Sequence, residues 1–191
     1  MNHHLIFEGA ELTGKSFIIS EIYNFLEKKY SSNDYPYLLD GCLWINADIG
    51  VFGTPNGKKI INNYIKQAKI LKNNNIIFEK FHITDQVYSL VYRNKIVNYQ
   101  IVEKELKKLN FKIIYLHINE NANNISQRLK DRLKLYPHYE RIKQNPKDYI
   151  RQQQIYKSIL EKTQLPVLKI NSTKLPDVLI TKKILKWLKE I

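Results

Sequence analysis

The sequence predicts an α/β fold in which helices cover both faces of a parallel β-sheet of about five strands. Short apolar segments alternate with longer amphipathic segments along the whole chain. Several of the short segments are almost continuously apolar, as expected of strands that are buried on both faces. A glycine-containing loop follows the first apolar segment directly. Together these features favour a three-layer α/β/α sandwich.

The first half of the chain contains three of the expected strands. The apolar spacing of Ile18, Ile22 and Leu26 is typical of a helix with one buried face. In chain order we expect a strand at His4–Glu8, a helix at Lys15–Tyr30, a turn at Ser31–Pro36, a strand at Cys42–Asn46, a helix at Gly57–Lys72 and a strand at Ile76–Glu79.

The second half continues the same alternation and shows no repeat and no change in composition. We therefore expect a single domain over residues 1–191. The expected elements are one or two helices within Asp85–Asn110, a strand at Lys112–His117, a helix at Asn123–Leu135, a polar segment at Tyr136–Lys147, a helix at Asp148–Thr163, a strand at Val167–Ile170 and a helix at Pro176–Lys189.

The bulk composition excludes several classes of protein. Cys42 is the single cysteine, so an intrachain disulfide and a cysteine-based zinc cluster are excluded. No apolar run approaches the roughly 20 residues of a membrane span, and the N-terminus does not resemble a signal peptide, so we expect a cytoplasmic protein without a membrane partner. The net charge is +13, but the lysines are spread along the chain, so we expect no nucleic-acid partner.

The loop after the first strand carries a phosphate-binding motif. Gly9 to Ser16 reads GAELTGKS and fits G-x-x-x-x-G-K-[ST] completely. The glycines let successive N–H groups face phosphate oxygens at a helix N-terminus. Lys15 supplies a cation for the β- and γ-phosphates, and Ser16 offers a hydroxyl to Mg²⁺. The sequence therefore predicts a site for ATP and Mg²⁺ formed by Gly9, Leu12, Thr13, Gly14, Lys15, Ser16 and Phe17.

The stretch from Glu8 to Ser16 resembles the E-G-x-[DE]-x-x-G-K-[ST] opening of thymidylate kinases and related deoxynucleoside kinases. The resemblance implies the P-loop nucleotide-kinase fold. It also implies that Glu11 contacts the sugar of the phosphate acceptor. Some thymidylate kinases carry a catalytic arginine at the position of Leu12, so the resemblance implies that the arginine comes from a lid here.

A second stretch, FGTPNGKKI from Phe52 to Ile60, resembles the segment that follows the Arg-Glu-Pro motif of bacterial thymidylate kinases. It implies that Phe52 and Thr54 contact the acceptor. The Arg-Glu-Pro motif is replaced by Ile49-Gly50-Val51, so the family's arginine for the acceptor phosphate is missing. Only one helix fits between this stretch and Glu79, so thymine specificity does not carry over.

The run EKFHITDQVYS, which begins at Glu79, resembles the D-R-F-H-[LI]-S-E-x-V-Y pattern of small nucleotide kinases. An acid at the end of a strand beside the P-loop strand is placed to hold Mg²⁺, which is the role we expect for Glu79. Lys80 replaces the family's arginine and is expected to bind the acceptor. Phe81 either stacks on the acceptor or belongs to the core. His82 and Asp85 have no assigned role.

Residues 125–147 resemble the lid of these kinases. Arg128 and Arg132 are four residues apart and therefore share one helix face. The resemblance implies that both stabilise the phosphoryl group during transfer. Arg151 resembles the arginine of the helix after the lid and is expected near the acceptor, although Gln154 stands where the family has a tyrosine.

The resemblance implies a kinase that transfers the γ-phosphoryl group of ATP to a (deoxy)nucleoside monophosphate. The first alternative is a deoxynucleoside kinase, in which Asp48 would act as the base for a 5′-hydroxyl. The second is a P-loop NTPase that acts with nucleic acid. The sequence leaves open which nucleobase the acceptor carries and whether the protein forms a homodimer.

Overall fold

The computed structural model describes residues 2–32, 37–174 and 177–191. Its sheet has five parallel strands in the order β2-β3-β1-β4-β5. The strands are β1 (His4–Glu8), β2 (Leu43–Asn46), β3 (Ile76–Glu79), β4 (Phe111–His117) and β5 (Val167–Asn171). The predicted sandwich with about five parallel strands is confirmed.

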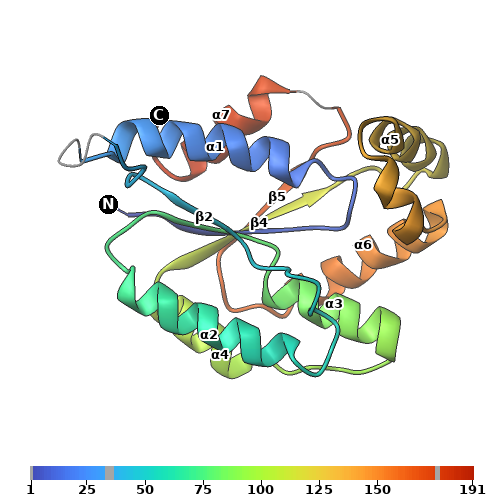
Figure 1. Cartoon of the computed structure of the whole chain (residues 1–191), viewed down its shortest axis with the longest axis horizontal. Helices are drawn as coiled ribbons and strands as arrows, with labels where there is room; N and C mark the ends of the chain where they lie inside the picture. Colours follow the sequence, from blue (N-terminus) through green and yellow to red (C-terminus); the bar gives the residue numbers. More distant parts are fainter. Residues whose placement is uncertain (1, 33–36, 175–176) are drawn as a thin grey trace.

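Helices cover both faces of this sheet (Figure 1). One face is covered by α1 (Lys15–Tyr30) and α7 (Val178–Trp187). The other face is covered by α2 (Gly57–Ile70), α3 (His82–Arg93), α4 (Gln100–Lys108) and α6 (Pro146–Leu160). At one end lie α5 (Ala122–Leu135) and the short 3-10 helix η1 (Pro137–Ile142), and these two elements pack against each other.

Alternation of side chains along β1 divides the core into two layers. Leu5 and Phe7 pack with α1 and α7, whereas Ile6 points to the opposite face and packs with α2, α3, α4 and α6. Period-2 alternation is expected of any strand, and here both faces are apolar because helices cover both. A third apolar cluster joins Leu12 of the loop after β1 to Ile125 and Leu129 of α5.

The predicted boundaries of β1, α1 and β3 agree with the structure residue for residue. The region predicted as one or two helices forms two, and α2 is the one helix between the Gly-Thr-Pro stretch and Glu79. The segment predicted as merely polar contains η1. The predicted turn at Ser31–Pro36 and the predicted helix start at Pro176 fall partly or wholly outside the described residues.

Across residues 2–32, 37–174 and 177–191, no helix combines the length and the apolar character needed to span a bilayer.

Candidate active site

The phosphate-binding loop connects the central strand β1 to the N-terminus of α1. Gly9 and Gly14 have φ angles of 144° and 77°, which side chains rarely allow. A Cβ added to Gly9 would lie 2.3 Å from the carbonyl oxygen of Leu116, so only glycine fits there. Lys15 donates to the carbonyl oxygens of Gly9 and Ala10, each at 2.8 Å. The Lys15 side chain therefore folds back and contacts the backbone of its own loop.

The side chain of Lys15 is almost fully buried against this loop. Burial lowers the pKa of its ammonium group to about 8, although Glu11 partly offsets the effect. The cation has backbone carbonyls as partners in place of a carboxylate, and its charge is therefore not directly neutralised. A triphosphate bound in the loop would supply that counter-charge.

Ser16 and Glu79 meet at the carboxyl ends of β1 and β3, which are neighbouring strands. The Ser16 hydroxyl donates to Oε1 of Glu79 at 2.7 Å. A hydroxyl and a carboxylate are the oxygen ligands that Mg²⁺ takes from a protein when nucleotide phosphates and water complete its shell. Within the described part of the chain there is no cluster of three or more His, Cys, Asp or Glu side chains for a metal. The pair therefore fits a phosphate-bound Mg²⁺, whose charge would neutralise that of the phosphates.

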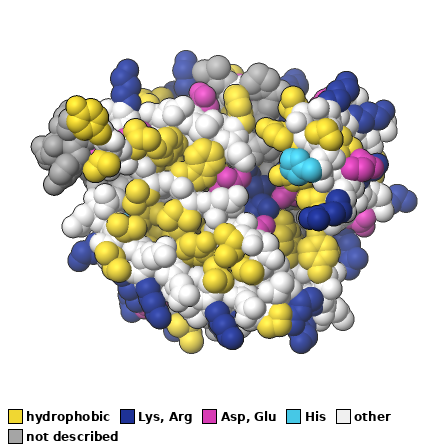
Figure 2. Space-filling model, viewed as in Figure 1, with side chains coloured by type: hydrophobic (Ala, Val, Ile, Leu, Met, Phe, Trp, Pro, Cys, Tyr) yellow, Lys and Arg dark blue, Asp and Glu magenta, His cyan; other side chains and the backbone are white. Residues whose placement is uncertain are grey.

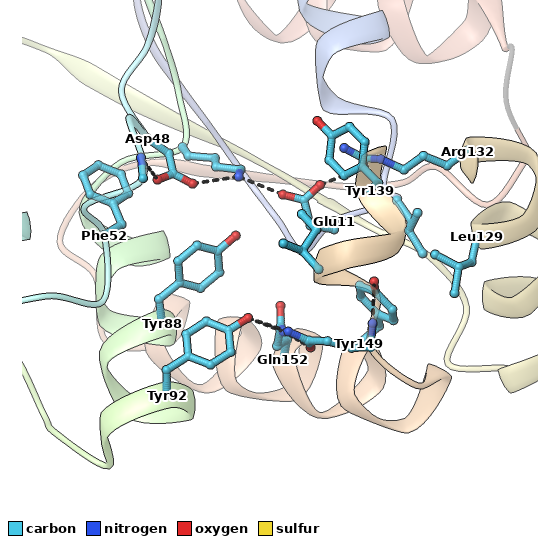
Figure 3. Close-up of a pocket in the computed structure, with 15 residues that line it drawn as sticks. Glu11, Asp48, Phe52, Tyr88, Tyr92, Leu129, Arg132, Tyr139, Tyr149 and Gln152 are labelled. Carbon is cyan, nitrogen blue, oxygen red and sulfur yellow. Dashed lines mark hydrogen bonds and ion pairs between the residues drawn. The ribbon is translucent and has the colours of Figure 1, made fainter. Parts of the chain in front are cut away.

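A chain of ion pairs extends from the loop across the site (Figure 3). Arg132 of α5 contacts Glu11 at 2.8 Å, Glu11 contacts Lys80 at 2.8 Å, and Lys80 contacts Asp48 at 2.8 Å. Burial opposes ionisation of Glu11, but Lys80, Lys15 and Arg132 outweigh it and hold the pKa of Glu11 well below its usual range. Glu11 is therefore ionised at neutral pH.

Lys80, which contacts the carboxylates of Glu11 and Asp48, has an unusual backbone conformation. It follows β3 directly and has a φ of 58°, in the left-handed region. Burial works against its charge, but Tyr88, Glu11 and Asp48 raise the pKa of Lys80 well above its ordinary value. Backbone strain of this kind concentrates at functional sites.

These side chains line a cavity with a volume of about 440 Å³. Figure 3 shows Glu11 and Arg132 on one side of it and Tyr88, Tyr92 and Gln152 on the other. The lining residues are Glu11, Leu12, Asp48, Gly50, Phe52, Lys80, Tyr88, Tyr92, Leu129, Arg132, Tyr139, Ile142, Gln144, Tyr149 and Gln152. A cavity with aromatic walls and charged groups at one end suits a flat, partly polar small molecule.

The space-filling view shows acidic and basic side chains together in a hollow bordered by apolar side chains (Figure 2). Elsewhere on this face the lysine and arginine side chains are scattered and form no continuous basic patch. This distribution does not resemble the basic stripe of a nucleic-acid-binding surface.

Arg128 and Arg132 share one face of α5 but have different partners. The Arg128 guanidinium donates to the backbone carbonyl oxygens of Leu12, Ser172 and Thr173, at 2.5–2.8 Å. It thereby joins α5 to the phosphate-binding loop and to the segment after β5. A catalytic contact by Arg128, as the resemblance implies, would require these three bonds to break. Arg132 faces the cavity instead.

The other predicted site residues divide into those that line the cavity and those that do not. Phe52 and Leu12 line it. Phe81 has no exposed surface and stacks on Phe78 with a centroid distance of 4.6 Å, so it belongs to the core and a substrate contact is excluded. The Thr54 hydroxyl donates a hydrogen bond to the backbone carbonyl oxygen of Val51 in its own turn. Thr54, Thr13, Phe17 and Arg151 do not line the cavity. Phe17 and Arg151 are exposed.

The structure gives Asp85 a role that the sequence did not. The carboxylate of Asp85 is buried and accepts hydrogen bonds from the backbone N–H of Gly53 at 2.8 Å and from the hydroxyl of Tyr99 at 2.7 Å. A Cβ added to Gly57 would lie 1.9 Å from its Oδ1. Asp85 therefore holds the Gly-Thr-Pro loop against α3. The neighbouring His82 is fully buried and contacts Glu103 at 3.3 Å.

We expect Asp85→Ala to lower the free energy of unfolding by about 2–4 kcal/mol, because two buried donors lose their acceptor. Urea denaturation measures the change. Asp131→Ala, which removes an exposed carboxylate from α5, serves as the control and should change stability by less than about 0.5 kcal/mol. Equal stabilities of the two variants would contradict the assigned role.

Several cavity residues were not predicted from the sequence, namely Tyr88, Tyr92, Tyr139, Gln144, Tyr149 and Gln152. They come from α3, from η1 and the segment after it, and from α6, which are far apart in the sequence. Gln152 is only 2% exposed. In the sequence, one signal pointed to Gln152. It is a polar residue on the face of a predicted helix that otherwise carries apolar residues.

No protein-family model and no curated protein sequence matches the chain. Solved structures do match over almost its entire length. YorR from Bacillus subtilis, in a complex with phosphorylated GDP, has a TM-score of 0.68 and 18% identity, with 97% of this chain and 95% of YorR covered.

Deoxyadenosine kinase from M. mycoides, with dCMP and dCDP bound, has a TM-score of 0.58 and 17% identity over 98% of this chain and 100% of that one. Shikimate kinase from Bacteroides thetaiotaomicron has a TM-score of 0.53 and 10% identity over 98% and 97%. At these identities the likeness shows the fold, which is that of P-loop kinases.

Proposed function

We propose that the chain is an ATP- and Mg²⁺-dependent kinase that phosphorylates the 5′-hydroxyl of a (deoxy)nucleoside. The observation that carries the proposal is the position of Asp48. Its carboxylate lines the cavity and is joined through Lys80 to Glu11 of the phosphate-binding loop. A base at this place accepts the proton that a hydroxyl group must lose when it attacks phosphorus.

The charges of the cavity favour a neutral acceptor. Lys80 and Arg132 are the basic side chains among the described residues that line it, and both are already paired with carboxylates. A nucleoside enters this site without disturbing the pairs. The dianionic phosphate of a monophosphate would instead lie next to Glu11 and Asp48, and it would have to compete with these carboxylates for Lys80 and Arg132.

Each residue then has a chemical task. The bond between the 5′-oxygen and the γ-phosphorus forms while the bond from that phosphorus to the bridging β–γ oxygen breaks, and ADP leaves. Asp48 takes the hydroxyl proton. Lys15 and Arg132 stabilise the charge on the moving phosphoryl group, and Ser16 and Glu79 would hold Mg²⁺. Glu11 and Lys80 position the sugar.

The solved structures support a nucleoside acceptor, since one of the matched proteins is named a deoxyadenosine kinase. A monophosphate acceptor, which the sequence resemblance implies, is the second candidate. It is favoured by the three cations Lys80, Lys15 and Arg132 around Glu11, because the same positive potential would attract a phosphate if Glu11 turned away.

The decisive test is a panel of deoxynucleosides and their monophosphates with Mg²⁺–ATP, read by ADP release and by identification of the phosphorylated product. We expect turnover with deoxynucleosides. Turnover with monophosphates alone would establish the second candidate. ATP hydrolysis that responds only to added DNA or RNA would overturn both.

We expect Asp48→Asn to lower kcat for a nucleoside by about 10²–10³-fold, because asparagine keeps the contact with Lys80 but accepts no proton. The control is the same variant with a monophosphate, whose oxyanion needs no base. Its turnover, where measurable, should change by less than about 10-fold. Full activity of Asp48→Asn on nucleosides would refute the role of Asp48 as a base.

A further inference from the structure

Gln152 of α6 carries a hydrogen-bond acceptor that the described chain does not use. The side chain lines the cavity, yet the residue is only 2% exposed. Its Oε1 atom is buried and has no hydrogen-bond partner among the described residues. A buried amide oxygen without a partner is costly, so its retention in a cavity wall points to a partner that enters from outside the chain.

The neighbours of Gln152 use its amide nitrogen and leave its amide oxygen without a partner among the described residues. Its Nε2 donates to Oε1 of Gln144 at 2.8 Å and to the hydroxyl oxygen of Tyr92 at 3.3 Å. The Gln144 Nε2 donates to the same hydroxyl oxygen at 2.7 Å. Both lone pairs of the Tyr92 oxygen are thus used, and its own O–H is left to donate. The wall therefore presents an acceptor beside a donor.

Flat aromatic surfaces surround this polar pair. The rings of Tyr88 and Tyr92 lie 5.4 Å apart between centroids, and Phe52 and Tyr149 also line the cavity. Figure 3 shows Tyr88, Tyr92 and Gln152 together, on the side of the cavity away from Arg132. The end near Arg132 and Glu11 is charged and the end near Gln152 is aromatic and neutral. A nucleoside placed with its sugar toward Glu11 directs its base to Gln152.

We propose that Gln152 determines base specificity by accepting a hydrogen bond from the exocyclic amino group of adenine or cytosine. The proposal rests on the proposed function, because it takes the acceptor in this cavity to be a nucleoside. With an amino base, the ring nitrogen beside the amino group is an unprotonated acceptor and matches the Tyr92 hydroxyl. With an oxo base, the exocyclic oxygen meets Gln152 Oε1 and the ring N–H meets the Tyr92 O–H, so both contacts are mismatched.

The test compares two pairs of substrates that differ at this edge of the base, deoxycytidine against deoxyuridine and deoxyadenosine against deoxyinosine. We expect kcat/KM to favour the amino member of each pair by on the order of 10- to 100-fold. Gln152→Met keeps the length of the side chain but removes its hydrogen-bonding groups, and it should reduce the ratio to less than about 3-fold.

The matched control is Gln154→Met, the same substitution on the same helix. Gln154 is exposed, contacts Glu120 and does not line the cavity, so its variant should keep the wild-type ratio. The shift of the melting temperature on addition of Mg²⁺–ATP checks that each variant is folded. If Gln152→Met does not fold, Tyr92→Phe decides, because it removes the matching donor at a residue that is 54% exposed and should also lower the ratio.

Equilibrium binding of the same four nucleosides to the wild-type protein separates the two proposals. Binding with an amino preference but no turnover of any acceptor would overturn the proposed function and support the role of Gln152. Turnover with a preference for the oxo bases would overturn the role of Gln152 and support the kinase. If the kcat/KM ratio of amino to oxo substrates stays unchanged in Gln152→Met and Tyr92→Phe, the proposed role of Gln152 is also overturned.

Discussion

Lys15→Ala is expected to reduce phosphoryl transfer by on the order of 10³-fold without unfolding the protein. The Lys15 ammonium group lies within the phosphate-binding loop, 2.8 Å from two backbone carbonyl oxygens. On binding ATP it would exchange these for phosphate oxygens. The substitution removes a cation that stabilises the negative charge on the γ-phosphoryl group in the transition state.

The fold should survive this substitution. The partly buried Glu11 keeps its ion pairs with Lys80 and Arg132 after the charge of Lys15 is lost. The measurements are kcat with the best acceptor of the panel and the melting temperature. Lys28→Ala, which removes an exposed lysine near the other end of α1, is the control and should retain activity. Near-normal activity of Lys15→Ala would exclude a P-loop mechanism.

The parts of the site that could be predicted from the sequence depend on local patterns. The glycine spacing of the loop fixes Lys15 and Ser16 at the start of a helix, whatever the rest of the chain does. The position of Glu79 followed from the end of an apolar strand. Its contact with Ser16 then required that β1 and β3 be neighbours, which the parallel sheet provides.

The parts that could not be predicted depend on contacts between distant segments. Tyr92 of α3 and Gln152 of α6 are joined by a hydrogen bond across 60 positions of sequence, and periodicity gives no information on such a pair. Phe81 is another example, because its motif position left a substrate contact and a core position open, and the structure places it in the core. Its side chain stacks on Phe78 within the core, a contact that the motif does not reveal.

The two arginines of α5 show what helix spacing can and cannot predict. Spacing of four residues placed Arg128 and Arg132 on one face, as the structure has them. It did not show that Arg128 would be used by three backbone carbonyls, one of them from Leu12 in the phosphate-binding loop. In this structure Arg128 therefore joins α5 to the loop and to the segment after β5, and we propose that Arg132 is the arginine that acts on the phosphoryl group.

Arg132→Ala should therefore lower kcat by about 10²–10³-fold and change the Kd of ATP by less than about 3-fold. The guanidinium group lies 3.8 Å from the centroid of the Tyr139 ring and contacts Glu11 through Nη1. Its Nε is buried without a hydrogen-bond partner among the described residues, so a donor is left over for a phosphoryl oxygen. An interaction that strengthens only as charge moves onto that oxygen affects turnover and leaves ground-state binding nearly unchanged.

Single-turnover kinetics and equilibrium ATP binding measure the two quantities separately. Arg132→Lys keeps the charge but loses the planar fork, so it should recover only part of the rate. Arg128→Ala is the informative comparison. Loss of its backbone contacts should loosen α5 and weaken ATP binding together with turnover, which is the pattern of a structural role. The same parallel loss in Arg132→Ala would show that Arg132 also only holds α5 in place. The charge on the transferred group would then have to be stabilised by Lys15 and Mg²⁺ alone.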